Sequence, residues 1–145
     1  MFYKKIKTVN IEPILAVLPS LTFVAISMGS TNPNKPPCSV IVPSTPLPTE
    51  ITDTIKSLEL GGETHRVFLR KLHVGQSIPP HIDKWMPEGW RRFHIPLISH
   101  PDTIMRWPEH DIELYLEPGY LWEVNHTIMH EVVHKSNLDR IHIQI

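Results

Sequence analysis

The chain has 145 residues, of which 41% are hydrophobic and 20% charged, and its formal net charge is −1. This length allows one domain, residues 1–145, with a hydrophobic core, and is short for two ordinary domains. The balanced charge argues against a nucleic-acid partner, and the composition excludes a disordered chain. The lone cysteine, Cys38, excludes an internal disulfide framework and a cysteine-based zinc site.

The N-terminal part combines a charged start, residues 1–7, with an apolar stretch at residues 14–30. Pro19 interrupts that stretch, and Ser, Thr and Gly dilute it, so it is a weak candidate for a membrane-spanning helix. A signal peptide or a membrane anchor stays an alternative. We expect a cytoplasmic protein with no membrane partner, in which this segment packs on the core.

The first 62 residues predict little regular structure. Residues 31–49 are rich in proline and predict an irregular loop with a short strand at "SVIV". Residues 50–60 have apolar side chains at helical spacing, and two glycines follow, which predicts a short helix or turn. We therefore expect residues 1–62 to be an N-terminal packing segment with a Pro-rich loop, and residues 63–145 to form a β core.

The β core is predicted from short alternating runs that are separated by Pro, Gly and Asn turns. These runs lie at 64–74, 77–83, 91–98, 112–120, 121–126, 128–134 and 140–145. Between them, 84–91 and 98–111 look like loops, and "KSNLD" looks like the turn of a hairpin that pairs the last two strands. The pattern predicts a mostly β fold, either a barrel or a double-sheet jelly roll, with a small N-terminal helical or irregular segment.

The six residues "MHEVVH" contain the H-E-x-x-H pattern of zinc metalloproteases. That chemistry needs a helix, on which His130 and His134 would be neighbours. Val132 and Val133 favour a strand instead, where the two histidines would stand about 13 Å apart, from roughly 3.3 Å per residue. We therefore disfavour the protease alternative, interpret Glu131 as an outward-facing residue, and expect His134 near the site or on its rim.

A second group of residues has the pattern of a different metal site. His81 and Asp83 form an H-x-D pair, and on a strand residues i and i+2 point to the same face. His130, 47 residues after Asp83, is a candidate third ligand from a distant strand. Two histidines and one carboxylate form the facial triad of non-haem Fe(II) oxygenases, which leaves open positions for a co-substrate and oxygen.

Three further polar residues are expected to face this triad. If "KSNLD" forms a hairpin, Arg140 shares a face with His130 and lies diagonally from it by roughly 7–8 Å. A guanidinium there suits a dicarboxylate that chelates the metal through its other end. On 91–98, Arg92 and His94 lie on the face opposite Phe93 and its apolar neighbours, although a bulge would turn Arg91 inward instead.

Three segments resemble the aspartyl/asparaginyl β-hydroxylase family of 2-oxoglutarate-dependent oxygenases. They are "LHVGQSIPPHID", "RRFHIPLI" and "GYLWEVNHTIMHEVVHKSNLDRIHIQI", and the likeness runs from about Phe68 to Ile145. The order of the motifs is more selective than any one of them. The resemblance implies a double-stranded β-helix, a jelly-roll and cupin-like fold, which agrees with the strand pattern.

The resemblance also implies roles for individual residues. The Fe(II) ligands would be His81, Asp83 and His130, and Arg140 would bind the distal carboxylate of 2-oxoglutarate. Arg92 and His94 would lie near the metal-bound end of this co-substrate. Arg70 stands where one branch of the family has a serine that contacts the co-substrate, so no role is transferred to it.

The implied activity is an O2-dependent hydroxylation of an amino-acid side chain, with 2-oxoglutarate converted to succinate and CO2. The substrate would be Asp or Asn in a peptide or a free amino acid such as proline, and the predicted loops give no means of choosing. Tryptophans in these loops, Trp85, Trp90 and Trp107, are candidates either for lining a substrate groove or for packing. A non-catalytic jelly-roll module that binds a metal or small ligand stays the main alternative.

Overall fold

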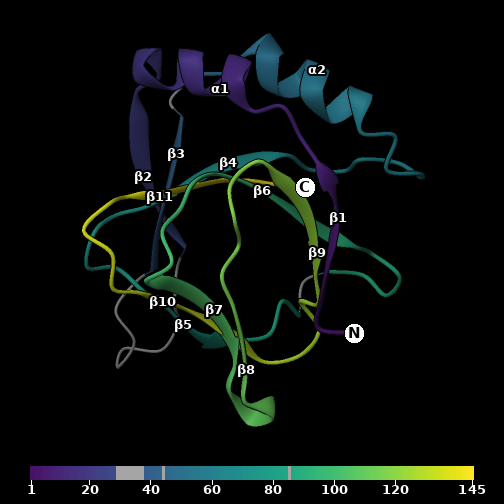
Figure 1. Cartoon of the computed structure of the whole chain (residues 1–145), viewed down its shortest axis with the longest axis vertical. Coiled ribbons are helices and arrows are strands. Elements are labelled where there is room, and N and C mark those ends of the chain that lie inside the picture. Colours follow the sequence, from purple (N-terminus) through teal and green to yellow (C-terminus); the bar gives the residue numbers. More distant parts are fainter. Residues whose placement is uncertain (29–37, 44, 85) are drawn as a thin grey trace.

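The computed structural model describes residues 1–28, 38–43, 45–84 and 86–145, with side chains described for 1–24, 45–84 and 86–145. These residues form two antiparallel sheets and a few short helices (Figure 1). The helices are α1 (Glu12–Val17), η1 (Leu18–Ser20), α2 (Thr49–Ser57) and η2 (Pro108–His110). None of the described helices has the length and hydropathy needed to cross a bilayer.

The larger sheet, called the major sheet, has seven strands. In spatial order they are β1 (Tyr3–Thr8), β9 (Tyr120–Val124), β6 (Arg92–Ile98), β11 (Arg140–Gln144), β4 (Phe68–Leu72), β3 (Cys38–Pro43) and β2 (Phe23–Met28). The smaller sheet, called the minor sheet, contains β5 (Ile78–His81), β10 (His130–His134), β7 (Thr103–Trp107) and β8 (Ile112–Leu114).

From β4 onward the chain alternates between the two sheets. β4, β6, β9 and β11 belong to the major sheet, while β5, β7, β8 and β10 belong to the minor sheet. This interleaved antiparallel order is the double-stranded β-helix, so the predicted fold class is confirmed. As a result, most strands that are consecutive in sequence lie in opposite sheets.

The predicted hairpin between the last two strands is wrong. β10 pairs with β5 and β7, whereas β11 pairs with β4 and β6. The turn-forming residues "KSNLD" do reverse the chain, but they carry it from one sheet to the other. A local turn signal fixes the reversal and does not fix which strands become hydrogen-bonded partners.

The predicted loop at 98–111 is also wrong, because it contains strand β7. Its burial alternates along the strand, with Thr103, Met105 and Trp107 buried and the residues between them partly exposed. Proline, histidine and aspartate at both ends of the segment hide this short period-2 pattern. Trp107 is completely buried, so packing is its role, whereas Trp85 lies outside the described residues.

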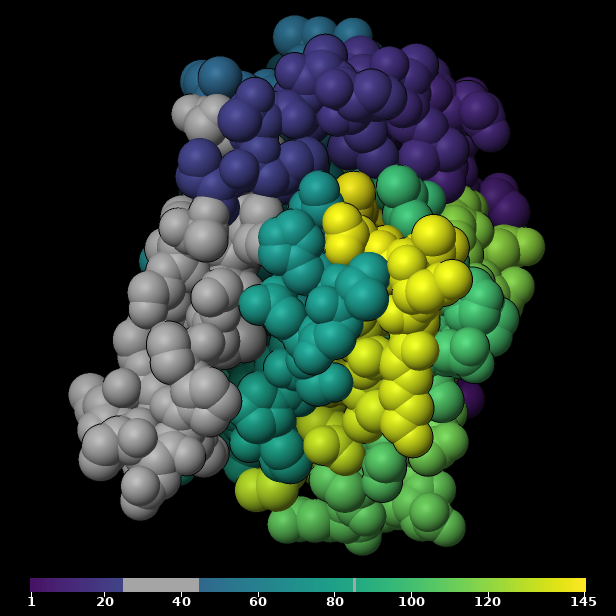
Figure 2. Space-filling view, turned by 90° about the vertical axis from the view of Figure 1, so that its left-hand side faces the viewer, coloured from purple at the N-terminus to yellow at the C-terminus, as the bar shows by residue number. Residues whose placement is uncertain are grey.

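The helices of the N-terminal segment cover the outer face of the major sheet, whereas its strands β1, β2 and β3 are part of that sheet. α1 and α2 lie across β4, β6 and β11 in Figure 1. The space-filling view shows the purple N-terminal residues above the adjacent teal and yellow residues that include β4 and β11 (Figure 2). The buried residues of this core are Ile11, Ile14, Leu18, Ile51, Ile55, Leu58, Leu69, Phe93, Ile95, Leu97, Leu121, Ile141 and Ile143.

The space between the two sheets is divided into an apolar and a polar part. The apolar part is a second core of Met105, Trp107, Leu114, Leu116, Trp122 and Val124. The polar part contains buried side chains from the inner face of the major sheet, among them His94, Arg140, His142 and Gln144. β6 shows the division within one strand, since its apolar residues face the helices and its polar residues face inward, as predicted.

Candidate metal centre

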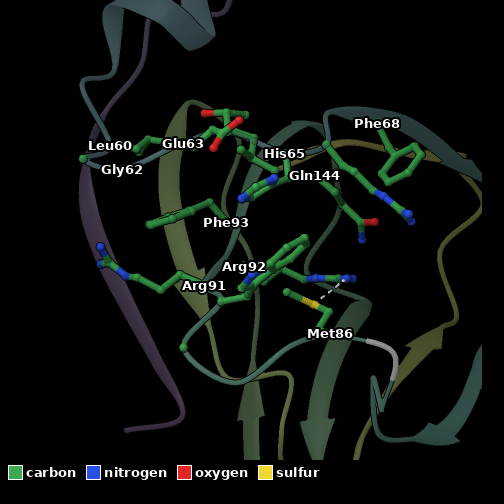
Figure 3. A pocket seen from close by; sticks show the side chains of 16 residues that line it. Leu60, Gly62, Glu63, His65, Phe68, Met86, Arg91, Arg92, Phe93 and Gln144 are labelled. Carbon is green, nitrogen blue, oxygen red and sulfur yellow. Dashed lines mark hydrogen bonds between the residues drawn. The ribbon is translucent and has the colours of Figure 1, made fainter.

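A pocket of about 260 Å³ opens beside the ends of β4, β6 and β11 (Figure 3). Its walls come from residues 60–66 and 86–93, together with Phe68 and the last two residues of the chain. The rings of His65 and Trp90 stack across these two segments, with centroids 4.3 Å apart and planes within 7°. Trp90 therefore lines a pocket; lining a groove and packing were the two roles that the sequence left open for it.

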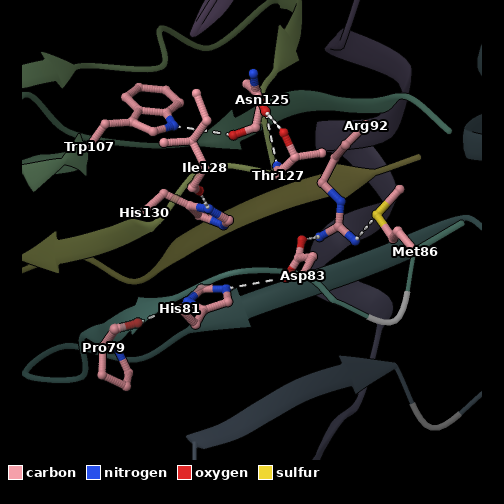
Figure 4. A network of polar contacts seen from close by, with 10 residues as sticks. All are labelled: Pro79, His81, Asp83, Met86, Arg92, Trp107, Asn125, Thr127, Ile128 and His130. Carbon is pink, nitrogen blue, oxygen red and sulfur yellow. Dashed lines mark hydrogen bonds and ion pairs between the residues drawn. The ribbon is translucent and has the colours of Figure 1, made fainter. Parts of the chain in front are cut away.

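His81 and Asp83 come together with His130, which is distant from them in sequence (Figure 4). His81 ends β5 and His130 begins β10, and the two residues are direct partners across this strand pair. Their ring centroids lie 4.4 Å apart. One ligand atom from each of the three residues lies within 4.8 Å of the others, so one cation could contact all three.

Backbone carbonyls fix the orientation of both histidine rings. His81 Nδ1 lies 2.8 Å from the carbonyl oxygen of Pro79, and His130 Nδ1 lies 2.8 Å from that of Ile128. Because a carbonyl can only accept, each Nδ1 carries the proton and donates it. A neutral ring held in this way has its lone pair on Nε2, the form in which imidazole binds a metal, and His81 reaches that form when it loses the proton that its Nε2 donates to Asp83.

Asp83 is held as a carboxylate. Burial raises its pKa, but the hydrogen bond from His81 and the charge of Arg92 outweigh that effect and place the pKa below its usual value. Its Oδ1 lies 3.3 Å from His81 Nε2, and its Oδ2 lies 3.1 Å from Arg92 Nη1. Once His81 has lost its Nε2 proton, the two imidazoles and the carboxylate have the donor chemistry of the Fe(II) facial triad.

The geometry decides between the two arginines at the start of β6. Arg92 points inward to Asp83, and its Nη2 also lies 3.1 Å from Met86 Sδ. Arg91 points outward and forms a bidentate pair with Glu123, at 2.7 and 2.6 Å. The strand therefore has no bulge that would turn Arg91 into the site.

Arg140 lies inside the barrel, on the sheet that faces the triad. It is only 6% exposed, and burial together with the neighbouring Arg70 cation lowers its pKa to about 9. Among the residues that the structure describes, no carboxylate forms an ion pair with it. A buried guanidinium whose charge no described carboxylate neutralises is suited to bind an anionic ligand.

His94 and His142 form a buried pair beside Arg140. Their Nδ1 atoms lie 3.3 Å apart, so one ring donates to the other. Burial lowers the pKa of both well below the usual value, and the charge of Arg140 lowers it further, so both rings are neutral at pH 7. A neutral ring carries one N–H, so the pair has a single outward N–H to offer, at one Nε2 or the other.

Strand β10 contains all five residues of the H-E-x-x-H match, so the two histidines cannot share one metal as they would on a helix. Glu131 faces away from the triad toward Arg106, at 3.5 Å. His134 is buried rather than on a rim, and its Nδ1 lies 2.6 Å from Thr103 Oγ1. His134 is not part of the three-residue cluster.

The sequence reasoning missed several inward-facing residues. His142 shares a strand face with Arg140, two residues away, and Arg70 is the direct partner of His142 on β4. The period-2 rule would have found His142, which lies on the same strand face as Arg140, whereas Arg70 follows only from the pairing of β4 with β11. His126 and Met86 belong to connecting segments, whose side-chain directions no periodicity predicts.

The sequence profile of a protein family described as aspartyl/asparaginyl beta-hydroxylase matches residues 41–145. No curated protein matches the chain. Among eight matching solved chains is a cupin domain from Bordetella pertussis Tohama I, with 15% identity and a TM-score of 0.43, over 58% of this chain and 83% of that one. The family match spans most of the sequence and contains all three clustered residues, and the protein belongs to the aspartyl/asparaginyl β-hydroxylase family.

Proposed function

We propose that this protein is an Fe(II)- and 2-oxoglutarate-dependent dioxygenase that hydroxylates an amino-acid side chain. The observation that carries the proposal is the cluster of His81, Asp83 and His130, which lies in the same barrel interior as the buried Arg140. When bound, Fe(II) and 2-oxoglutarate supply the reaction with O2, in which one oxygen atom enters a C–H bond and the other enters succinate as CO2 leaves.

The three clustered residues are prepared for a metal before it arrives. The carbonyls of Pro79 and Ile128 accept the Nδ1 protons, so Nε2 is the ring nitrogen left for a metal in both histidines. The Asp83 carboxylate supplies the negative charge that a divalent cation needs. The hydrogen bond between His81 and Asp83 links two of the ligands, and a cation would replace the proton between them.

Arg140 and His94 would hold the co-substrate. Arg140 offers a planar set of donors to the distal carboxylate of 2-oxoglutarate, inside a low-dielectric interior that strengthens the pair. Arg92 and His94 lie on the part of β6 nearest the cluster, where the metal-bound end of the co-substrate would lie. With two anionic ends to bind, a dicarboxylate matches this set better than a monocarboxylate does.

The deciding experiment follows formation of the ternary complex and its turnover. Without oxygen, Fe(II) and 2-oxoglutarate should produce the visible charge-transfer absorption of the chelate, and admission of oxygen should then produce succinate. His130→Ala should abolish the absorption. Glu131→Ala is the matched control, because Glu131 is adjacent in sequence but faces Arg106 on the other side of the sheet.

Each outcome has a definite meaning for the proposal. Absence of the absorption in the wild-type protein would rule the proposal out. Absorption without succinate, with or without added amino acids or peptides, would leave a metal- and ligand-binding jelly roll instead of an oxygenase. Absorption that persists in His130→Ala would show that the ligand set is wrong.

A further inference from the structure

The C-terminal end of β10 contains a buried histidine that the proposed function does not use. Burial alternates along this strand, so His130, Val132 and His134 face the barrel interior. At roughly 3.3 Å per residue, His134 stands about 13 Å along the strand from His130. The proposed metal site therefore lies at one end of this inward face, and His134 lies at the other end.

The ring of His134 is held at one nitrogen only. Its Nδ1 lies 2.6 Å from the hydroxyl oxygen of Thr103, the residue paired with it on β7. Its Nε2 is buried and forms no hydrogen bond with any residue that the structure describes. Folded proteins seldom leave a buried polar atom in this state, so a bound ligand is the partner to consider for Nε2.

The environment of His134 makes its ring a neutral donor. Burial lowers its pKa, the charge of Arg140 lowers it further, and Asp139 and the backbone of Leu138 oppose this shift more weakly. The ring is therefore neutral at pH 7 and has a single N–H. When the Thr103 hydroxyl donates to Nδ1, that N–H is at Nε2 and is available to an acceptor in the interior.

Arg140 lies near this ring, since its charge acts on the pKa of His134. The two residues approach the interior from opposite sheets, His134 from β10 and Arg140 from β11. A cationic donor and a neutral N–H donor thus lie in the same part of the barrel. A carboxylate has two acceptor oxygens, so one anion can satisfy both donors.

We infer that His134 donates its Nε2–H to the distal carboxylate of the co-substrate, beside the Arg140 guanidinium, and makes the site selective for that carboxylate. The inference rests on the proposed function in that this co-substrate is 2-oxoglutarate. Val132 lies between His130 and His134 on the same strand face, and it offers an apolar contact to the methylene groups of the co-substrate.

The test compares 2-oxoglutarate with 2-oxopentanoate, in which a methyl group replaces the distal carboxylate. Calorimetry on the Zn(II)-loaded protein measures the binding of both ligands without turnover. His134→Phe should weaken the binding of 2-oxoglutarate by about tenfold or more, because one hydrogen bond to a charged group is lost. The binding of 2-oxopentanoate should change by less than about twofold. An equal loss for both ligands, or no loss for 2-oxoglutarate, would overturn the inference.

Two further variants separate the donor from the shape of the ring. His134→Gln keeps an N–H donor near the position of Nε2 and should weaken 2-oxoglutarate binding by less than about threefold. A loss as large as that of His134→Phe would contradict the role of the N–H. His110→Phe is the matched control, since it makes the same change at an exposed histidine on η2, and it should leave the binding of both ligands unchanged.

The tautomer of His134 provides a readout that does not depend on any variant. Long-range ¹H–¹⁵N correlation spectra of the wild-type protein should show the Nε2–H form. Its proton resonance should move downfield on addition of 2-oxoglutarate and stay in place on addition of 2-oxopentanoate. An Nδ1–H ring in the 2-oxoglutarate complex, or the same shift with both ligands, would overturn the inference.

Failure of this inference is distinguishable from failure of the proposed function. A wild-type protein that binds both ligands equally well would contradict the proposed co-substrate, and the role of His134 would be lost with it. A wild-type protein that prefers 2-oxoglutarate, with the same preference in His134→Phe, would keep the proposed function and remove His134 from the site.

Discussion

Arg140 places a charge inside the barrel at a cost to the stability of the fold. Because no described carboxylate neutralises it, Arg140→Met should raise the free energy of unfolding of the ligand-free protein by about 1–4 kcal/mol. The same change should weaken 2-oxoglutarate binding by about 100-fold or more, since a charged hydrogen-bond partner is lost. Thermal unfolding with and without 2-oxoglutarate measures both effects, and a destabilised Arg140→Met protein would contradict this account.

The direction of the hydrogen bond between His94 and His142 should control co-substrate binding. His142 Nε2 is buried and has no hydrogen-bond partner among the described residues, so we place the proton of His142 on Nδ1, from which it donates to His94. His94 then keeps its Nε2–H for a carboxylate. We expect His142→Phe to raise KM for 2-oxoglutarate about tenfold with little change in kcat, the effect of one weakened hydrogen bond to a charged group.

Long-range ¹H–¹⁵N correlation spectra report the tautomer of His94 directly. The wild-type protein should show the Nε2–H form, and His142→Phe should show a mixture of the two neutral forms. His142→Gln, whose amide can still donate to His94 Nδ1, should restore part of the wild-type affinity. A wild-type His94 in the Nδ1–H form would disprove the assigned direction.

Protons should compete with the metal at the triad. The hydrogen bond with Asp83 raises the pKa of His81 above 6.5, so His81 is protonated below that raised value and must lose its proton to bind a metal. Affinity for Mn(II) should therefore fall by about tenfold per pH unit once the pH drops below the His81 pKa. Calorimetric titration across this range measures the slope, and a flat profile would exclude His81 as a ligand.

The ion pair of His81 and Asp83 should also make the stability of the metal-free protein depend on pH. The raised pKa of His81 means that its stabilising contribution is complete below 6.5 and disappears as the pH rises through the folded-state pKa. The lowered pKa of Asp83 means that its contribution is complete above 3.8 and disappears as the pH falls. The stability difference between wild type and His81→Ala should accordingly be larger at about pH 5.5 than at about pH 8.5.

At the scale of elements, each central strand of the major sheet has one face in the outer core and the other face in the barrel interior. Outward residues pack under the helices, and inward residues line the site. Ile51 on α2 is completely buried in the outer core, so Ile51→Ala should lower the free energy of unfolding by about 2–5 kcal/mol. Metal affinity at 25 °C should be unchanged, because the mutated side chain lies on the far side of the sheet from the triad.

The division of a strand into an apolar outer face and a polar inner face is also the feature that could be predicted from the sequence. On β6, alternation identified Arg92 and His94 as inward residues without any knowledge of their partners. β7 was hidden because its short alternating run is bounded by turn-forming residues. β1 was not predicted because all six of its residues are exposed at the edge of the sheet, where charged side chains replace a buried face.

At the scale of the whole molecule, the motif order predicted that His81, Asp83 and His130 lie together, but not the strand pairing that brings them together. The hairpin argument placed Arg140 beside His130 on a neighbouring strand. The structure instead places Arg140 on the opposite sheet, so both residues reach the interior from different sides. Pairing between strands distant in sequence depends on the closure of the whole barrel, which no local pattern encodes.

The interleaved strand order has a consequence for folding. His81 meets His130 only after a loop of about fifty residues has closed, and β1 meets β9 only when Tyr3 reaches Val124. Contacts of such high sequence separation slow folding, because the chain loses entropy before the contacts stabilise it. The residues of the proposed metal site should therefore assemble late, and capture of a metal during refolding would report that the barrel has closed.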